Sequence, residues 1–383
     1  MSKTISEQNT GIPQPASKFD AQAALSAGLS QDEVNELEIL LDPVKWAYVN
    51  FEWEPYDYQA PILRLLPETS SAVFRFARRT GKTECVCLMI LWYAFTQYNK
   101  KETNASNEMQ YRILIITPFE TQIDTIFDRL AQLINASMTL KESIVKHNKH
   151  DIRLNNGSHI LGLTAGTKNS SGAASTRSKG ADVLVLDEAD YLSEEDISNV
   201  RNIRNEDPKR IRMICASTPA GKRDSYYRWC TEATTSYHAD GEYLEETGIL
   251  RFKIITAGDK GIRGNGWTEF YAPSQVNRKL LEFNEETQQT YLEDLKDSLP
   301  SYRYDQEVLA LFGEEALGVY QKRFIDYAVL QGSDLKCSYA NMHVRARRPG
   351  NIRILGVDWD EYILFEQQYV IWTILEVIYK CPR

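Results

Sequence analysis

The sequence predicts an α/β fold in which a parallel sheet is covered by helices. Four short apolar runs have the length and composition of buried strands, and longer amphipathic segments separate them, at residues 73–76, 113–116, 183–186 and 211–216. Alternation of this kind is typical of parallel sheets, because each crossover to the next strand passes through a helix. The chain has 383 residues, of which 43% are hydrophobic, so its length is enough for about two domains with real cores.

Residues 1–44 are expected to form a flexible leader and a short acidic helix over residues 31–41. The N-terminus is polar and lacks the apolar run of a signal peptide. The apolar stretch at residues 369–379 is too short and too polar to span a bilayer, so we expect no membrane association. Six cysteines without a C-x-x-C pair indicate reduced core thiols of a cytosolic protein.

The segment at residues 74–83 ends in Gly-Lys-Thr, the phosphate-binding sequence of nucleotide-hydrolysing enzymes. An apolar strand precedes it and a helix is predicted over residues 83–98, which is the context that the motif needs. Lys82 would reach the β- and γ-phosphates of ATP, and the hydroxyl of Thr83 would bind Mg²⁺. Phe76 occupies the position of the usual first glycine. The predicted ATP-binding loop residues are Arg78, Arg79, Thr80, Gly81, Lys82 and Thr83.

The run at residues 183–186 is followed by Asp187 and Glu188, as a Walker B strand requires. Asp187 would help to hold Mg²⁺, and Glu188 would polarise the attacking water. A buried strand that ends in an acidic loop would have the same local pattern. Its position after a Gly-Lys-Thr loop is what favours an ATPase.

Three further positions are candidates for nucleotide contacts. The amide of Gln59 can both donate to and accept from the adenine edge. Ser217 and Thr218 follow an apolar strand and lie at the carboxyl end of the sheet, where they could sense the γ-phosphate. Arg177, like the two loop arginines, could complete a neighbouring subunit's site in a ring. A solvent-exposed surface charge is the alternative for each arginine.

A hairpin is predicted over residues 151–161, where apolar and polar residues alternate around Asn-Gly. After residue 256 a Gly-rich loop and helical segments at 285–298 and 304–312 indicate a lid or linker, with no further strand of the earlier kind until residue 352. The expected organisation is a leader at 1–44, an ATPase domain at 45–256, a lid at 257–349 and a new domain from 350 to 383. Two strands cannot bury a core alone, so this last domain is expected to be incomplete.

The net charge of −9 argues weakly against an acidic partner such as DNA. Basic residues nevertheless cluster at 201–223 and 345–353, and a DNA-binding surface needs only a local positive patch. Each cluster could equally be a solvated face.

Together these residues resemble the large terminase subunit of tailed bacteriophages, the motor that packages DNA into a procapsid. The resemblance covers about residues 45–360. It rests on the arginine-containing loop before Thr80-Gly81-Lys82-Thr83, Gln59, Arg177-Ser178-Lys179-Gly180 before Asp187-Glu188, Ala216-Ser217-Thr218-Pro219 and the linker-like segment 304–312.

The resemblance implies a P-loop NTPase that uses ATP and Mg²⁺, acts on double-stranded DNA and works as a homo-oligomeric ring in the host cytoplasm. Its further implied partners are the portal and the small terminase subunit. It assigns phosphate sensing to Arg78, catalysis to Glu188, a trans-acting finger to Arg177 and coupling to Ser217 and Thr218.

The segment 356–360 resembles the first strand of the terminase nuclease, which has an RNase H-like fold. The resemblance makes Asp358 the first metal-binding carboxylate of that site. The later carboxylates of that family would lie beyond residue 383, so we expect no endonuclease activity from this chain.

Two other functions remain possible from the sequence. Asp187-Glu188-Ala189-Asp190 spells the box of one RNA helicase class, although residues 220–383 show no second nucleotide-binding lobe of the kind that helicases use. The chain could also be a non-catalytic DNA-binding remnant.

Overall fold

The computed structural model describes residues 19–97, 111–165, 181–201, 212–221, 224–243, 250–285 and 288–313. The chain divides into two compact units, Met1–Ala316 and Leu317–Arg383. The second unit lies outside the described residues, and so does everything predicted for residues 345–383. The first unit holds the predicted strands and helices of the ATPase domain.

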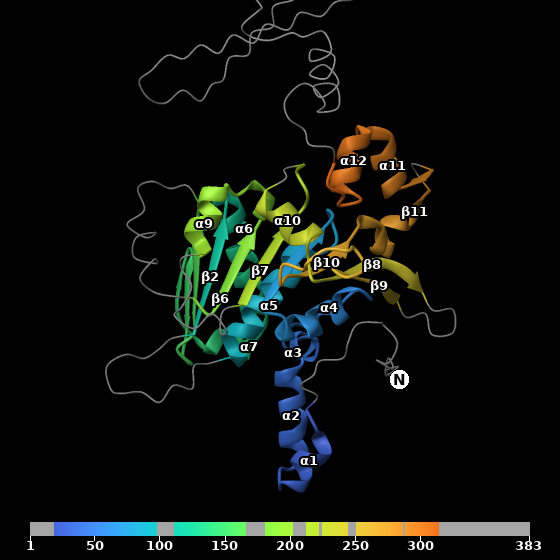
Figure 1. Cartoon of the computed structure of the whole chain (residues 1–383). Coiled ribbons are helices and arrows are strands. Elements are labelled where there is room, and N and C mark those ends of the chain that lie inside the picture. The colour runs from blue at the N-terminus through green and yellow to red at the C-terminus, as the bar shows by residue number, and fades with distance from the viewer. Residues whose placement is uncertain are drawn as a thin grey trace, which may run out of the picture. The chain divides into compact units, whose positions relative to one another are not determined.

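A ten-stranded, mostly parallel sheet organises the described residues (Figure 1). The strand order is β3-β4-β5-β2-β6-β7-β1-β10-β8-β9, and every pair from β5 to β8 is parallel. The strands are β1 Ser71–Phe76, β2 Arg112–Thr117, β3 Ile144–Asn148, β4 Asp151–Leu154, β5 His159–Thr164, β6 Val183–Asp187, β7 Arg212–Ser217, β8 Thr235–Tyr243, β9 Leu250–Thr256 and β10 Thr268–Ala272. This sheet confirms the predicted α/β fold with a mostly parallel sheet between helices.

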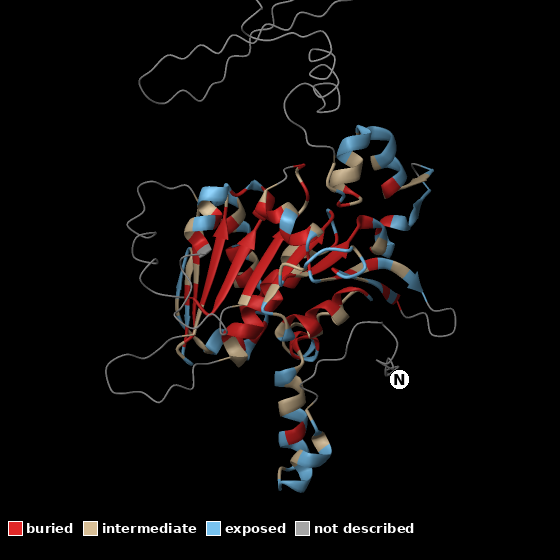
Figure 2. Cartoon of the chain, viewed as in Figure 1, coloured by how far each residue is buried: buried red, intermediate tan, exposed pale blue. Residues whose placement is uncertain are grey.

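Helices cover both faces of the sheet, so its central strands are buried on both sides (Figure 2). Alternate residues of β1 belong to separate cores: Phe74 packs on the side of α5 and α6, and Val73 packs on the side of α9 and α10. This double burial explains why the strands are continuous apolar runs. The helices are α5 Lys82–Thr96, α6 Glu120–Ala136, α7 Met138–Glu142, α9 Glu194–Arg201 and α10 Ser225–Thr231.

Four helices precede the sheet: α1 Ala21–Ser26, α2 Gln31–Leu41, α3 Pro43–Phe51 and α4 Gln59–Leu65. The helix predicted over residues 31–41 is confirmed, and a capping box between Ser30 and Glu33 fixes its start. None of the helices that the structure describes is long and apolar enough to cross a membrane.

The predicted hairpin is confirmed as the antiparallel pair β4 and β5. Gly157 in its turn has a φ of +84°, a conformation that favours glycine. Strand β3 adds to β4 at the same edge of the sheet.

The sheet continues past residue 256, contrary to the expectation that no further strand of this kind occurs before residue 352. Strand β10 lies inside the sheet, third from one edge, and pairs in parallel with both β1 and β8. Its sequence, Thr-Glu-Phe-Tyr-Ala, escapes an apolar-run search because Glu269 interrupts it. The carboxylate of Glu269 is nevertheless buried, because Arg75 of β1 neutralises it there.

A small, mainly helical segment follows β10 and corresponds to the predicted lid. It contains the short 3-10 helices η3 Ser274–Val276 and η4 Arg278–Leu281, a hairpin of β11 Phe283–Asn284 and β12 Gln289–Thr290, and the helices α11 Tyr291–Ser298 and α12 Ser301–Glu307. The predicted helix at 285–298 therefore begins six residues later, and the predicted helix at 304–312 ends at Glu307. We call residues 274–307 the lid.

Candidate active site

The Gly-Lys-Thr segment forms a tight turn between β1 and α5, as the motif predicts. Gly81 caps α5 with a φ of +75°, and a Cβ at this position would collide with the amide of Gln59. Glycine is therefore required twice, by backbone conformation and by space. The N-terminus of α5 presents backbone N–H groups and its positive dipole end at this turn, which suits an anion.

The ends of three parallel strands bring the predicted catalytic residues together. Strand β7 pairs with both β1 and β6, so Ser217, Asp187 and the phosphate loop meet at one edge of the sheet. Nζ of Lys82 lies 2.5 Å from Oε1 of Glu188. The hydroxyl of Ser217 donates to the other oxygen, Oε2, at 3.1 Å. Both carboxylate oxygens of Glu188 are thereby held.

Glu188 has a left-handed backbone, with a φ of +50°. A non-glycine residue in this region costs free energy and is found mostly where the fold positions a functional side chain. Here the turn after β6 aims the carboxylate of Glu188 at Lys82 rather than continuing the strand.

Asp187 is buried, and its Oδ1 has no hydrogen-bond partner among the described residues. Burial raises the pKa of Asp187 to about 6, although the charge of Lys82 opposes the rise. An orphaned buried carboxylate oxygen is unusual and calls for a ligand. Mg²⁺ fits this donor set, because it prefers carboxylate and hydroxyl oxygens, and Thr83 supplies the hydroxyl at the start of α5.

The amide of Gln59 braces the phosphate loop. Its Nε2 donates to the carbonyl oxygen of Thr80 at 3.1 Å, and its Oε1 accepts the N–H of Tyr56 at 2.9 Å. The hydroxyl of Tyr58 donates to the same Thr80 carbonyl at 2.8 Å. Recognition of adenine by Gln59 stays a prediction, and the contacts found here assign it a supporting role.

The lid holds the backbone of the loop at both arginines. The hydroxyl of Ser274 donates to the carbonyl of Arg78 and the amide of Asn277 donates to that of Arg79, each at 2.8 Å. The N–H of Arg78 donates to the carbonyl of Glu307 at 2.9 Å. Sequence reasoning missed these lid residues, since no local pattern marks a side chain that binds a distant carbonyl.

The side chains of the two loop arginines also face the lid. Nε of Arg78 lies 3.3 Å from Oε2 of Glu307. The guanidinium of Arg79 lies 4.2 Å from the centre of the Tyr291 ring, which is a cation–π contact. Arg79 has a φ of +60°, so the loop is strained at this position.

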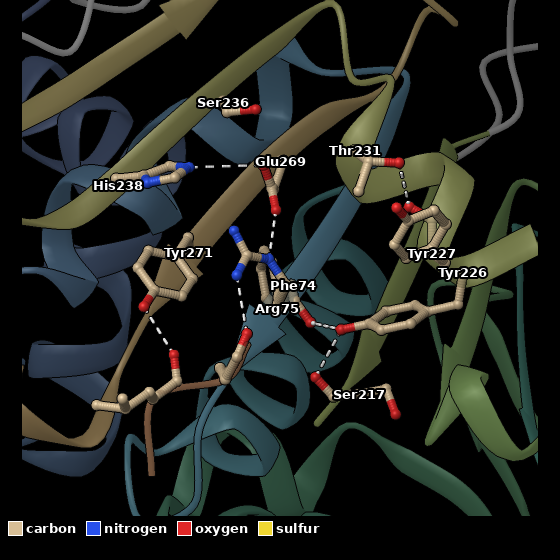
Figure 3. Close-up of polar contacts among 12 residues, drawn as sticks. Phe74, Arg75, Ser217, Tyr226, Tyr227, Thr231, Ser236, His238, Glu269 and Tyr271 are labelled. Atoms are coloured by element: carbon tan, nitrogen blue, oxygen red, sulfur yellow. Dashed lines mark hydrogen bonds and ion pairs between the residues drawn. The ribbon is translucent and has the colours of Figure 1, made fainter. Parts of the chain in front are cut away.

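A second group of polar contacts ties the strand ends together behind the loop (Figure 3). The hydroxyl of Tyr226 donates to the carbonyls of Phe74 and Ser217, at 3.1 and 2.8 Å, and so bridges β1 and β7. The hydroxyl of Thr218 donates to the carbonyl of Phe76 at 2.9 Å. The sequence did not single out Tyr226, although it touches the backbone of a predicted coupling residue.

Arg75 makes a separate set of polar contacts next to these (Figure 3). Its Nε lies 2.6 Å from Oε1 of Glu269, and its NH1 donates to the carbonyl of Ala310 at 2.8 Å. Burial favours the protonated form of Glu269, but the charge of Arg75 and hydrogen bonds from His238 and Ser236 outweigh burial and lower the pKa of Glu269 to about 2. The segment that follows the lid is thus anchored to the sheet.

A cavity of about 1180 Å³ lies between the phosphate loop and the lid. Its walls include Lys82, Thr83, Glu188 and Thr218 on the sheet side. The lid side contributes Leu280, Tyr291, Leu295, Leu299, Tyr302, Arg303, Gln306 and Glu307. This volume exceeds that of a typical small-molecule pocket, so a nucleoside triphosphate would fit with its hydration.

Most of the predicted site residues meet here, and two lie outside the described residues. Arg78, Arg79, Gly81, Lys82, Thr83, Glu188 and Thr218 line the cavity, while Gln59, Thr80, Asp187 and Ser217 are buried residues beside it. Arg177 and Asp358 fall outside the part of the chain that the structure describes.

The family model of the DEAD/DEAH box helicases matches residues 56–224, less than half of the chain. This region contains the phosphate loop, Glu188 and both predicted coupling residues. A search among curated proteins found no match.

Several solved structures are similar to the chain. The large terminase ATPase domain of Thermus phage P74-26 is 17% identical, with a TM-score of 0.45, and the match covers 69% of this chain and 96% of that one. The HK97 bacteriophage large terminase is 13% identical, with a TM-score of 0.45 and coverage of 68% and 50%. The DEAD-box helicase Mss116, bound to ssRNA and UDP-BeF, is 14% identical, with a TM-score of 0.36 and coverage of 67% and 45%. Similarity at this level does not define a substrate.

Proposed function

We propose that this protein is an ATP-hydrolysing motor that drives double-stranded viral DNA into a procapsid. The observation that carries ATP hydrolysis is the meeting of Lys82, Glu188 and Ser217 at the N-terminus of α5. An anion site, a cation and a held carboxylate on adjacent strand ends are the parts that phosphoryl transfer to water needs.

The residues divide the chemistry between them. The backbone N–H groups at the start of α5 and the ammonium of Lys82 bind the phosphates, so Lys82 leaves Glu188 when ATP enters. Glu188 then keeps the hydrogen bond from Ser217, and its other oxygen can accept a proton from the attacking water. Mg²⁺, held by Thr83 and through Asp187, would neutralise charge on the transferring phosphate.

We propose that Ser217 and Thr218 transmit the presence or absence of the γ-phosphate to strands β7 and β1. Ser217 contacts the catalytic carboxylate, and Thr218 contacts the backbone of β1 just before the loop. Because Ser217 and Thr218 are adjacent, we propose that a change at Glu188 reaches β7 through Ser217 and β1 through Thr218. We propose that this coupling moves the lid, which holds the loop through Ser274 and Asn277.

The DNA substrate is proposed from the sequence resemblance to large terminase subunits, and so are the homo-oligomeric ring, the portal and the small subunit. In such a ring Arg177 would complete a neighbour's site. An RNA or DNA helicase is the second candidate, because the DEAD/DEAH box family model matches the same catalytic region.

ATP turnover, measured alone, with duplex DNA and with single-stranded RNA or DNA, tests both candidates. We expect stimulation by duplex DNA, and loss of turnover in Lys82→Ala. The matched control is Lys146→Ala, which removes a lysine paired at 2.6 Å with Asp151, outside the cavity. Stimulation by single strands with strand separation would favour the helicase, and a wild-type chain without turnover would exclude both motors.

A further inference from the structure

We propose that Arg303 of the lid binds a phosphate group of the nucleotide, in exchange for the carboxylate of Glu307 that pairs with it in this structure. The proposal rests on nucleotide binding at the cavity described above. It adds a phosphate contact from the lid to those from the loop.

The two residues lie one turn apart on α12, and both line the cavity that contains Lys82. NH1 of Arg303 lies 3.2 Å from Oε1 of Glu307. The other carboxylate oxygen, Oε2, lies 3.3 Å from Nε of Arg78. A single carboxylate therefore joins an arginine of the lid to an arginine of the phosphate loop, with one oxygen for each.

The charges of the cavity favour an exchange of anions. Four cations and three carboxylates line the cavity: Arg78, Arg79, Lys82 and Arg303, and Glu84, Glu188 and Glu307. Glu188 pairs with Lys82, and Glu307 pairs with both Arg78 and Arg303. A triphosphate that takes Lys82 from Glu188 also reaches a region where two guanidinium groups share one carboxylate. Guanidinium groups bind phosphate with two parallel hydrogen bonds, and a polyphosphate carries more charge than one carboxylate.

Little is lost when Glu307 releases Arg303. The side chain of Arg303 is 54% exposed, so water can solvate it when it leaves, and the partly buried carboxylate of Glu307, 18% exposed, keeps its contact with Arg78. The backbone contact between the N–H of Arg78 and the carbonyl of Glu307 does not involve the carboxylate, so it can persist during the exchange.

Unequal effects of substituting the two partners distinguish this exchange from a structural ion pair: only the loss of Arg303 should weaken nucleotide binding. We would measure binding of fluorescent ATPγS to the full chain and expect Arg303→Gln to weaken it by about tenfold, the size of one charge-assisted hydrogen bond. Glu307→Gln removes the competing anion, so affinity should stay the same or rise. Arg303→Lys keeps the charge without the planar fork and should bind with intermediate affinity.

Arg228→Gln is the matched control. Arg228 is 53% exposed and pairs with Glu194 at 3.2 Å, and it does not line the cavity. Its removal should leave binding unchanged.

Equal weakening by Arg303→Gln and Glu307→Gln would show a purely structural pair, and unchanged binding in Arg303→Gln would also overturn the proposal. Both outcomes leave nucleotide binding by the wild-type chain intact. Failure of the wild-type chain to bind, or full binding by Lys82→Ala, would instead overturn the proposed function and this inference with it.

Discussion

Two arginines three positions apart make the same kind of ion pair in different surroundings. Arg75 on β1 pairs with Glu269 at 2.6 Å, and the two side chains are 10% and 3% exposed. Arg78 in the phosphate loop pairs with Glu307 at 3.3 Å, and the side chains are 68% and 18% exposed. Both pairs join the P-loop strand to residues about two hundred positions later in the chain.

The burial of each ion pair determines whether its two partners can separate. Removing one partner of a buried pair leaves a charge in a medium of low dielectric, so Arg75 and Glu269 stay together. Water and incoming anions can replace one partner of an exposed pair at small cost, so Arg78 and Glu307 can part. Arg75 on β1 is thus part of the structural core, whereas Arg78, three residues later, belongs to the candidate active site.

Both kinds of attachment occur at the C-terminal end of the lid. Beyond its C-terminal end, Arg75 binds the carbonyl of Ala310 and the hydroxyl of Tyr271 donates to that of Leu309. At Glu307 the partly buried carboxylate contacts Arg78 of the loop, whose side chain is exposed. The Arg75 contact is buried with Glu269, whereas the Glu307 carboxylate faces the cavity, so only the second can be reached by an incoming anion.

The buried pair should be the most sensitive to substitution. Arg75→Leu leaves the carboxylate of Glu269 without its cation and also removes the hydrogen bond to Ala310. We expect the free energy of unfolding to fall by about 3–5 kcal/mol. Urea denaturation followed by circular dichroism measures this change. A loss below about 1 kcal/mol would mean that water reaches Glu269 and that the pair is not a fixed part of the sheet.

The same pair predicts how stability depends on pH. The pKa of Glu269 is about 2 in the folded protein, below its ordinary value of 4.5, so its contribution is present above pH 4.5 and is lost as pH falls toward 2. The shift corresponds to at most about 3 kcal/mol. Other carboxyl groups titrate in this range, so the measured quantity is the stability difference between the wild-type chain and Glu269→Gln.

This difference should shrink steadily between pH 4.5 and 3, because protonated Glu269 resembles glutamine. Arg75 and His238 both face the carboxylate and remain in either protein. A difference that stays constant over this window would show that Glu269 is not ionised in the folded state.

The parts of the site that sequence predicts are those with a local pattern. The apolar runs and the Gly-Lys-Thr turn give β1, α5 and β6 directly, and parallel pairing brings Lys82, Glu188 and Ser217 to one edge of the sheet. Predicting these elements and this meeting point does not require knowing which residues far along the chain contact them.

The parts that sequence did not predict depend on partners far along the chain. Strand β10 was missed because a glutamate in a short strand looks like a loop until Arg75, 194 positions away, is known to neutralise it. Gln59 lies beside the phosphate loop, but its contacts with Tyr56 and Thr80 could not be derived from its position in the sequence. A sequence pattern therefore predicts the secondary-structure element in which a residue lies, whereas the hydrogen-bond partners of its side chain depend on tertiary packing.

The smallest effect on stability is expected for Arg78→Gln. Because its ion pair is exposed, the free energy of unfolding should change by less than about 0.5 kcal/mol. Its backbone contacts with Glu307 and Ser274 do not depend on the side chain and hold the loop in place. Nucleotide binding should nevertheless weaken, since a cation of the cavity is lost. Parallel urea denaturation and ATPγS binding separate these effects: a loss of stability close to that of Arg75→Leu would place Arg78 in the scaffold, and the contrast between the two arginines would disappear.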